Sequence, residues 1–320
     1  MPHRCAILDD YQNVALKIAN WSSVRADLDI VVFDKPLGDE DAVIRALKDF
    51  SIVCAMRERT RFSRKVIEDL PNLKLLITTG MRNASFDLKA AAERGVTVCG
   101  TGAVGNPTTG ITIGLMLELT RRIGFENARL KSGEPWQMTV GTDTDGKTLG
   151  CVGLGKLGTR VAKVAQALGM RTVAWSQNLT EEKAREVGVE FVEKDELFLQ
   201  ADVVSVHLVL SGRSRGTVGA AELGLMKPTA YIINTARGPL IDEAALLAAL
   251  RERRIAGAGL DVFDVEPLPM DHPFRKLDNV VLTPHLGYVS AENYAVYFRD
   301  TVEDIRAFLD GKPLRIISAA

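Results

Sequence analysis

The sequence predicts an α/β protein with two doubly wound parallel sheets, and two observations lead to this prediction. Short apolar runs rich in Val and Ile alternate with segments whose apolar residues recur at helical spacing. This alternation occurs in two series, separated by a long segment without strand-like runs. Strands alternating with helices indicate parallel sheets covered on both faces. The length of 320 residues is sufficient for two such domains.

The first series contains five strand candidates with helices between them. The strand candidates are RCAILDD, DIVVFD, SIVCAM, LKLLITTG and VTVCG, and helical spacing is clearest in DAVIRALKDF and RKVIEDL. The segment from Pro107 to about Lys131 follows, and its apolar spacing predicts one long helix between two lobes.

The second series begins after the loop SGEPWQMTVGTDTDGK. Its strand candidates are TLGCVGLG, RTVAWS, VEFV, ADVVSVHLVL, AYIINTA, GAGLDVF and NVVLTPH. A last helix, predicted over about residues 291–309, is long enough to pack back on the first lobe. We therefore expect residues 1–104 and 291–320 to form one discontinuous domain, and residues 105–290 to form the other.

Charge and cysteine usage argue against several classes of partner. The 40 basic and 41 acidic residues give a formal net charge of -1, so no basic field is available for nucleic acid or an anionic membrane. The start of the chain lacks an apolar signal region and no segment has the length of a membrane span, so we expect a cytoplasmic protein. The four cysteines are expected to be small buried hydrophobes rather than metal ligands or disulfides; they are Cys5, Cys54, Cys99 and Cys151.

A glycine-rich turn follows the first strand of the second series. Gly153, Gly155 and Gly158 form the pattern G-x-G-x-x-G between a predicted strand and a predicted helix. In that context the N–H groups of Lys156 and Leu157 can approach a pyrophosphate, and the helix N-terminus favours its negative charge. The alternative is a tight turn that needs glycine for steric reasons alone. The flanking strand and helix favour dinucleotide binding.

The end of the next strand bears on the choice between NAD and NADP. An acidic residue there would accept hydrogen bonds from the ribose hydroxyls and repel a 2′-phosphate. The sequence has Ser176 instead, followed by Gln177 and Asn178. These residues do not exclude a phosphate, yet no arginine stands beside them in sequence. NAD and NADP both remain open, with a slight preference for NAD.

Four polar residues follow strand candidates farther along the second series. They are Arg237, Asp261, Glu266 and His285. His285 directly follows Thr283-Pro284, which terminates the predicted strand before it. Parallel strands place their carboxyl ends at one edge, where ligands bind. Taken singly, Arg237 and Glu266 could form a surface ion pair, and His285 could be a packing residue without a catalytic role. Their occurrence at successive strand ends favours a catalytic site.

Together these motifs resemble the D-isomer-specific 2-hydroxyacid dehydrogenase family. The resemblance lies in GKTLGCVGLGKLG, HLVL, MKPTAYIINTARGPLIDEAALLAAL, GAGLDVFDVEPLP and NVVLTPHLG. It implies two Rossmann/flavodoxin-like domains with a cleft between them, a substrate lobe made from both chain ends, and NAD or NADP as cofactor. It also implies a homodimer, and the interconversion of a small D-2-hydroxy acid and its 2-oxo acid by hydride transfer.

The resemblance assigns catalytic roles to three residues. His285 would donate a proton to the carbonyl oxygen of the 2-oxo acid and take it back in the reverse direction. Glu266 would bind the other ring nitrogen and orient the imidazole. Arg237 would hold the substrate carboxylate and carbonyl oxygen with its planar fork.

Binding residues follow from the same resemblance. Asp261 would accept a hydrogen bond from the nicotinamide carboxamide. Backbone N–H groups near Gly80 would meet the substrate's acid group. Arg57 matches a family arginine at a strand end that faces the cleft and would contact the substrate; the alternative is a solvated charge. The remaining expected contacts are His207, Thr235, Ala236 and Gly287 for the cofactor, and Met81, Arg82 and Tyr288 for the substrate.

Two alternative functions stay open at this point. Relatives with this fold can act as NAD-sensing scaffolds that bind protein partners, but the presence of Arg237, Glu266 and His285 argues against this class. A short phosphoglycerate dehydrogenase-like enzyme is the other alternative. A long form with a regulatory domain is not expected, because the sequence ends at GKPLRIISAA. The sequence does not identify the 2-hydroxy acid or the physiological direction.

Overall fold

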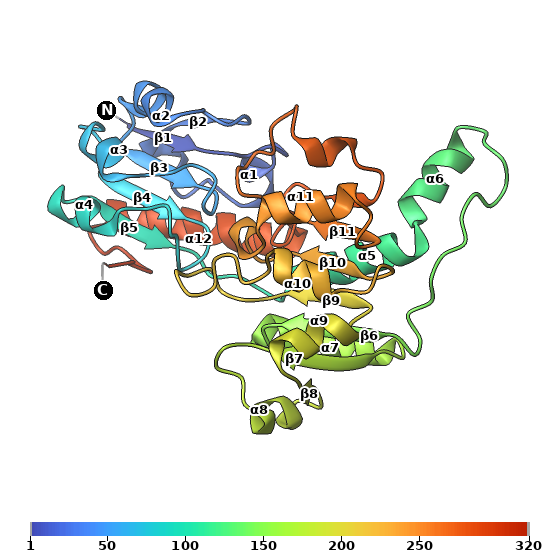
Figure 1. The fold of residues 1–320 in the computed structure, drawn as a ribbon. Coiled ribbons are helices and arrows are strands. Elements are labelled where there is room, and N and C mark those ends of the chain that lie inside the picture. The colour runs from blue at the N-terminus through green and yellow to red at the C-terminus, as the bar shows by residue number, and fades with distance from the viewer. Residues whose placement is uncertain (1, 319–320) are drawn as a thin grey trace. The chain divides into compact units, whose positions relative to one another are not determined.

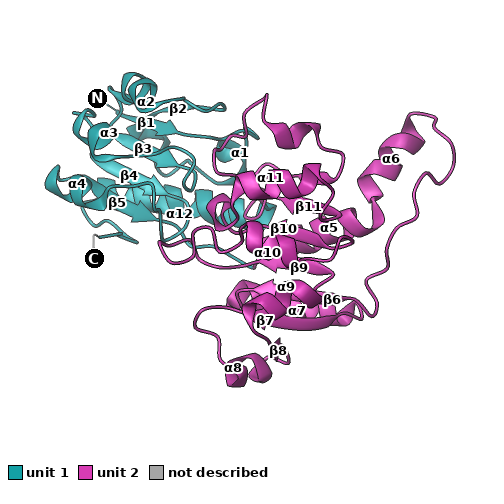
Figure 2. Cartoon of the chain, viewed as in Figure 1, with its two compact units in different colours: residues 1–105, 290–320 teal, residues 106–289 magenta. Residues whose placement is uncertain are grey.

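The computed structural model describes residues 2–318, which form two compact units (Figures 1 and 2). One unit comprises the chain up to Gly105 together with the segment from Ser290 onward, and the other comprises Asn106–Val289. Each boundary differs by one residue from the one expected from the sequence.

The first unit contains a five-stranded parallel sheet in the order β2-β1-β3-β4-β5. This is the flavodoxin-like order. All five strands coincide with predicted runs; they are β1 (His3–Ile7), β2 (Leu28–Val32), β3 (Ile52–Ala55), β4 (Leu75–Thr78) and β5 (Thr97–Gly100). The helices are α1 (Ala15–Ile18), α2 (Glu40–Leu47), α3 (Arg64–Glu68), α4 (Leu88–Glu93) and α12 (Ala291–Leu309), with a 3₁₀ turn η1 (Arg25–Asp27). Because α12 contacts β4 and α1, the C-terminal helix completes this unit.

The last described residues add a short antiparallel contact to the edge of this sheet. Ile316 pairs with Cys99 of β5, and the N–H of Ile317 donates to the carbonyl of Val98 at 2.8 Å. Arg315, in this segment, donates from Nε to Oδ1 of Asp304 on α12 at 3.0 Å. Asp304 is fully buried, and burial raises its pKa from the usual 3.8 to about 7.

Asp304 should make the stability of the protein depend on pH. The unfolded chain loses this proton near pH 4 and the native protein keeps it until about pH 7. The native state therefore binds more protons in this window, and its free energy of unfolding falls as pH rises, by up to about 4 kcal/mol. The free energy of unfolding of Asp304→Asn, measured by denaturant unfolding from pH 4 to 8, should depend less on pH than that of wild type. Asp310→Asn, which alters an exposed pair with Arg306, should keep the wild-type slope; parallel curves for Asp304→Asn and wild type would contradict the prediction.

The second unit contains a seven-stranded parallel sheet in the order β12-β11-β10-β9-β6-β7-β8. Its strands are β6 (Thr148–Val152), β7 (Arg171–Trp175), β8 (Glu190–Phe191), β9 (Val203–Val206), β10 (Tyr231–Asn234), β11 (Gly257–Leu260) and β12 (Val280–Leu282). The helical elements are α5 (Pro107–Arg121), α6 (Ile123–Lys131), α7 (Lys156–Ala167), α8 (Glu181–Glu186), α9 (Lys194–Gln200), α10 (Ala220–Leu225), α11 (Glu243–Arg251), η2 (Gly238–Leu240) and η3 (Pro273–Lys276). The chain winds outward from β6 to β8 and resumes at β9 on the other side of β6. This reversal is a topological switch point, where open α/β sheets bind ligands.

Apolar layers cover both faces of the second sheet. Ile232 and Ile233 are successive residues of β10, and each belongs to a different buried cluster. Successive side chains of a strand point to opposite faces, so the sheet is enclosed on both sides. This explains why its strands are continuous apolar runs rather than alternating ones.

The single long helix predicted over residues 107–131 is wrong. The chain breaks at Arg122, whose φ of +52° is left-handed, so α5 ends before it and α6 begins after it. The side chain of Glu118 accepts the N–H of Gly124 at 2.6 Å, which stabilises the break. Apolar spacing alone does not detect such a break. In Figure 1, α6 projects away from the sheet of its own unit, and none of its residues is buried.

Candidate active site

The three glycines of the turn after β6 have different structural roles. A Cβ at Gly153, where φ is +105°, would lie 2.9 Å from the backbone of His207, and one at Gly158 would lie 2.2 Å from the carbonyl oxygen of Gly153. These two positions therefore require glycine for packing. A Cβ at Gly155 would meet nothing within 4 Å. Gly155 is also the N-cap of α7 and provides no side-chain cap, so the first N–H groups of the helix can bind an anion.

His207 places an unusual polar group beside this turn. The residue as a whole is half-buried, but both ring nitrogens are shielded from solvent and have no hydrogen-bond partner within residues 2–318. Desolvation lowers the pKa of His207 to about 4, so the ring is neutral at neutral pH. Because buried polar atoms are normally satisfied, these nitrogens fit a polar ligand at the turn.

Substituting Gly155 should separate cofactor binding from folding. A methyl group in Gly155→Ala would project into space that the protein leaves open, where the backbone would approach a pyrophosphate. We expect the cofactor Kd to rise about tenfold, equivalent to one charge-assisted hydrogen bond. Fluorescence titration with reduced cofactor measures this change. Gly224→Ala, an equally open glycine in α10, should leave the Kd unchanged, and equal Kd values for both variants would refute the prediction.

Arg237 follows β10 in a turn that Asn234 holds. Asn234 is buried; its Nδ2 donates to the carbonyl of Arg237 at 2.9 Å, and its Oδ1 accepts the N–H of Ala236 at 3.0 Å. Nη1 of Arg237 donates to the carbonyl of Ala236 at 2.8 Å. The turn also requires Gly238, because a Cβ there would lie 2.2 Å from the backbone of Phe263. Asn234 is not among the site residues expected from the sequence, although an amide at the end of the apolar strand YIIN is a usable signal.

His285 and Glu266 form the central pair of the site. His285 lies just beyond β12 with a left-handed φ of +53°. Its Nδ1 lies 2.6 Å from Oε2 of Glu266, and Oε1 of Glu266 accepts the N–H of Phe263 at 2.9 Å. Within the described residues Nε2 of His285 has no hydrogen-bond partner. The pair thus has an oriented imidazole with one nitrogen available to a substrate.

Asp261, at the end of β11, fixes the turn that carries this histidine. Its Oδ1 accepts from the hydroxyl of Thr283 at 2.5 Å and from the N–H of Leu286 at 2.7 Å, and its Oδ2 accepts the N–H of Gly287 at 2.8 Å. Burial raises the pKa of Asp261 despite these donors. Asp261 therefore positions His285. Its expected contact with the nicotinamide carboxamide stays a prediction.

Three further expected contact residues are engaged within the second unit. A Cβ at Gly287 would lie 3.1 Å from Oδ2 of Asp261 and 3.2 Å from the side chain of Thr108, so the protein's own packing leaves little room for a side chain there. Tyr288 meets the His285 ring edge-on at 5.5 Å between centroids. The hydroxyl of Thr235 lies 2.8 Å from that of Thr112 on α5. Their contacts with a cofactor or substrate stay predictions.

In the first unit, Arg57 lies over Gly80 at the ends of β3 and β4. The backbone of Arg57 is left-handed, with φ of +51°, and its N–H donates to Oγ1 of Thr79 at 3.0 Å. Its Nη1 donates to the carbonyl of Thr79 at 3.2 Å. A Cβ at Gly80 would lie 2.1 Å from that nitrogen. Arg57 is therefore held in one place rather than being a freely solvated charge.

The backbone donors after β4 are only partly available. The N–H of Gly80 donates to Oγ1 of Thr101 at 2.9 Å, so this donor is already engaged within the first unit. Its expected contact with the substrate stays a prediction. The N–H groups of Met81 and Arg82 have no hydrogen-bond partner within residues 2–318. For these two residues the expected contact with an acid group stays a prediction.

Comparison with known proteins establishes the family. The model of the D-isomer specific 2-hydroxyacid dehydrogenase NAD-binding domain matches residues 113–287. This chain belongs to the D-isomer specific 2-hydroxyacid dehydrogenase family. The resemblance inferred from the motifs is thereby confirmed, and NAD(P) is the cofactor of the second unit.

Three similar proteins illustrate the range of relatives. A glyoxylate reductase of Aeropyrum pernix is 33% identical over 295 residues, which cover 89% of this chain and 88% of the reductase. A D-3-phosphoglycerate dehydrogenase of Methanocaldococcus jannaschii is 37% identical over 277 residues, covering 85% of this chain but 52% of that protein. The crystal structure of a phosphoglycerate oxidoreductase from Vibrio cholerae has a TM-score of 0.91 and 34% identity, covering 97% of this chain and 99% of that one. The chain thus spans about half the length of one relative and nearly all of the other two.

Proposed function

We propose that this protein interconverts a small D-2-hydroxy acid and its 2-oxo acid, with NAD(P) as the hydride carrier. One observation carries the proposal. The His285–Glu266 pair and Arg237 lie at the carboxyl ends of adjacent strands, on the sheet edge that also carries the glycine turn. A proton donor and a guanidinium beside a dinucleotide site are the groups that carbonyl reduction requires.

The chain's own residues supply the proton transfer. When bound, the nicotinamide supplies the hydride. His285 donates a proton from Nε2 to the carbonyl oxygen as negative charge develops there, and accepts it in the reverse direction. Glu266 keeps Nδ1 as a donor toward its carboxylate and stabilises the positive ring. Arg237 binds the substrate carboxylate and the carbonyl oxygen, so it also stabilises the developing charge.

The geometry of the second unit supports a set of proposed cofactor contacts. N–H groups of Lys156 and Leu157, at the start of α7, bind the pyrophosphate. Ser176 would lie near the ribose, and a polar cofactor atom would satisfy one ring nitrogen of His207. The other proposed contacts are Gly153, Gly155, Gly158, Thr235, Ala236, Asp261 and Gly287.

The first unit is proposed to bind the substrate. Arg57 and the N–H groups of Met81 and Arg82 are charge donors suited to a carboxylate. Tyr288 in the second unit, which packs against His285, would limit the size of the substrate side chain. The charge donors of the first unit support a small 2-oxo acid as the substrate.

A substrate panel tests the proposal. Oxidation of NADH and of NADPH is followed with glyoxylate, hydroxypyruvate, pyruvate and larger 2-oxo acids. We expect turnover with at least one small 2-oxo acid. Failure with every acid and both cofactors would refute the proposed function. The scaffold alternative is not favoured, because Arg237, Glu266 and His285 are all present.

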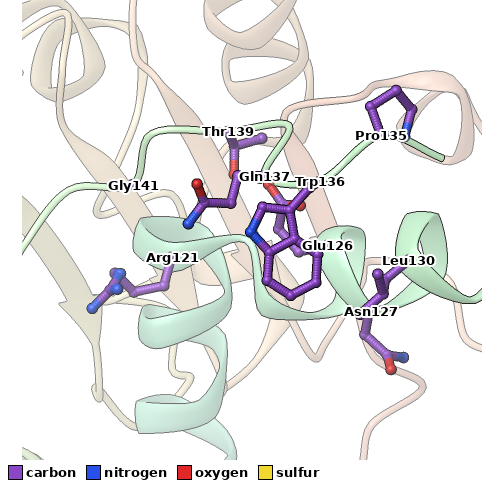
Figure 3. A pocket seen from close by; sticks show the side chains of 9 residues that line it. All are labelled: Arg121, Glu126, Asn127, Leu130, Pro135, Trp136, Gln137, Thr139 and Gly141. Atoms are coloured by element: carbon purple, nitrogen blue, oxygen red, sulfur yellow. Dashed lines mark hydrogen bonds between the residues drawn. The ribbon is translucent and has the colours of Figure 1, made fainter.

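The proposed assembly is a homodimer that uses the projecting segment of the second unit. Helix α6 and the chain that follows it expose large apolar side chains; they are Ile123, Leu130, Trp136, Met138 and Val140. Trp136 is 76% exposed and lines the same pocket as Glu126 (Figure 3). Exposed apolar side chains concentrated on one segment are typical of a protein interface.

Disrupting this segment should yield monomers. Trp136→Asp combined with Val140→Asp places charges in the apolar surface, and sedimentation velocity should then give a monomer mass where wild type gives a dimer. Met270→Asp alters an equally exposed side chain elsewhere and should remain dimeric. A monomeric wild type would contradict the proposed assembly.

The remaining partner assignments are also proposals. Within residues 2–318 no helix is both long and apolar enough to cross a membrane, and no three His, Cys, Asp or Glu side chains converge as metal ligands would. The four cysteines are buried and free. Free buried thiols and balanced charge support a cytoplasmic enzyme without nucleic-acid partners.

A further inference from the structure

An arginine from a separate loop lies at the end of β7. Strand β7 ends at Trp175, and Ser176, Gln177 and Asn178 follow. The loop after β9 returns to this point: Nε2 of Gln177 donates to the carbonyl of Arg213 at 2.8 Å. Nη2 of Arg213 lies 3.4 Å from Oδ1 of Asn178, 35 residues away in sequence. The structure therefore supplies the arginine that the local sequence lacks.

In dinucleotide-binding units of this kind, the residues at the end of this strand discriminate between NAD and NADP. β7 pairs with β6, and the end of β6 carries the glycine turn. In such units the adenosine ribose of a dinucleotide lies at the end of the neighbouring strand, which here is β7. A carboxylate there would repel a 2′-phosphate, but Ser176 carries no charge. The acidic residue Glu181 is the next in sequence, and its carboxylate binds Arg185 within α8.

The guanidinium of Arg213 is not neutralised. Among residues 2–318, no carboxylate forms an ion pair with it, and its side-chain hydrogen bond goes to the neutral amide of Asn178. The Arg213 side chain is exposed, so a ligand can reach it. A planar guanidinium with free donors matches a phosphate dianion, and neighbouring hydroxyl and amide groups add uncharged donors.

We propose that Arg213, Ser176 and Asn178 form a binding site for the 2′-phosphate of NADPH, and that the enzyme prefers NADPH to NADH. This inference rests on the proposed function, because it assumes that a dinucleotide occupies the glycine turn. It reverses the slight preference for NAD that the sequence suggests. Arg213 supplies the charge, while the Ser176 hydroxyl and the Asn178 amide donate to the phosphate oxygens.

Direct binding measurements test the site without requiring turnover. Fluorescence titrations give the Kd of NADPH and NADH, and competition with 2′,5′-ADP and 5′-AMP isolates the phosphate contribution. Wild type should bind NADPH at least about tenfold more tightly than NADH, the equivalent of one hydrogen bond to a charged group. Arg213→Ala should remove this difference by weakening NADPH alone.

Matched variants make the outcome specific. Arg215→Ala removes a guanidinium from the same exposed loop and should preserve the preference, whereas Arg213→Lys should retain part of it. Ser176→Asp should favour NADH over NADPH. Equal or tighter binding of NADH by wild type, or an equal effect of Arg213→Ala on both cofactors, would overturn the inference. Turnover with NADH alone would overturn the inference and leave the proposed function intact. A preference for NADPH in binding, without turnover of any 2-oxo acid, would refute only the proposed function.

Discussion

Replacing His285 with glutamine is expected to lower kcat about a thousandfold in both directions. Glutamine can accept and donate hydrogen bonds near the carbonyl oxygen, but it cannot transfer the proton that Nε2 of His285 supplies. The Kd of the reduced cofactor should change less than about twofold, because the glycine turn and His207 are unaffected. Steady-state rates and fluorescence titrations separate these two effects.

The chain contains a matched control for this substitution. His272 also pairs with a glutamate, with Nε2 lying 3.1 Å from Oε1 of Glu243. His272→Gln removes a histidine–carboxylate pair of the same kind without altering the end of β12, so its kcat should stay near the wild-type value. A normal kcat for His285→Gln would reject its role as proton donor, and an equal loss in both variants would indicate a structural effect.

Replacing Arg237 with lysine should lower kcat/KM about a hundredfold, with losses in both kcat and substrate affinity. The charge is retained, but an ammonium cannot hold the carboxylate and the carbonyl oxygen in a single plane. The substrate would then be less well oriented, and the developing negative charge less stabilised. Saturation kinetics at fixed cofactor concentration measure both parameters.

The control is Arg251→Lys, which changes an exposed arginine at the end of α11 and should leave the kinetics unchanged. A change in KM alone for Arg237→Lys would restrict Arg237 to ground-state binding. Unchanged kcat and KM would reject its role altogether.

Much of the fold could be predicted because apolar runs and helical spacing are local properties. The strand candidates of both series form the two sheets, and the predicted last helix coincides with α12 (Ala291–Leu309). The break at Arg122 could not be predicted in this way. It depends on one left-handed residue and on the contact of Glu118 with Gly124, neither of which changes the apolar pattern.

The candidate site was predictable where residues lie directly at strand ends. The sequence placed Arg237, Glu266 and His285 at one sheet edge, and the structure joins the last two by a hydrogen bond. Contacts between separate loops could not be inferred. The bond from Gly80 to Thr101 and the approach of Arg213 to Asn178 each join segments that the sequence does not connect.

The stereochemistry of the product tests the central claim most directly. Pyruvate and hydroxypyruvate are each reduced with NADPH or NADH, and the 2-hydroxy acid is resolved by chiral chromatography beside the oxidised cofactor formed. We predict that wild type forms the D enantiomer, one molecule per cofactor oxidised, and that His285→Gln forms almost none. An L or racemic product, or equal yields from wild type and His285→Gln, would contradict the proposed mechanism.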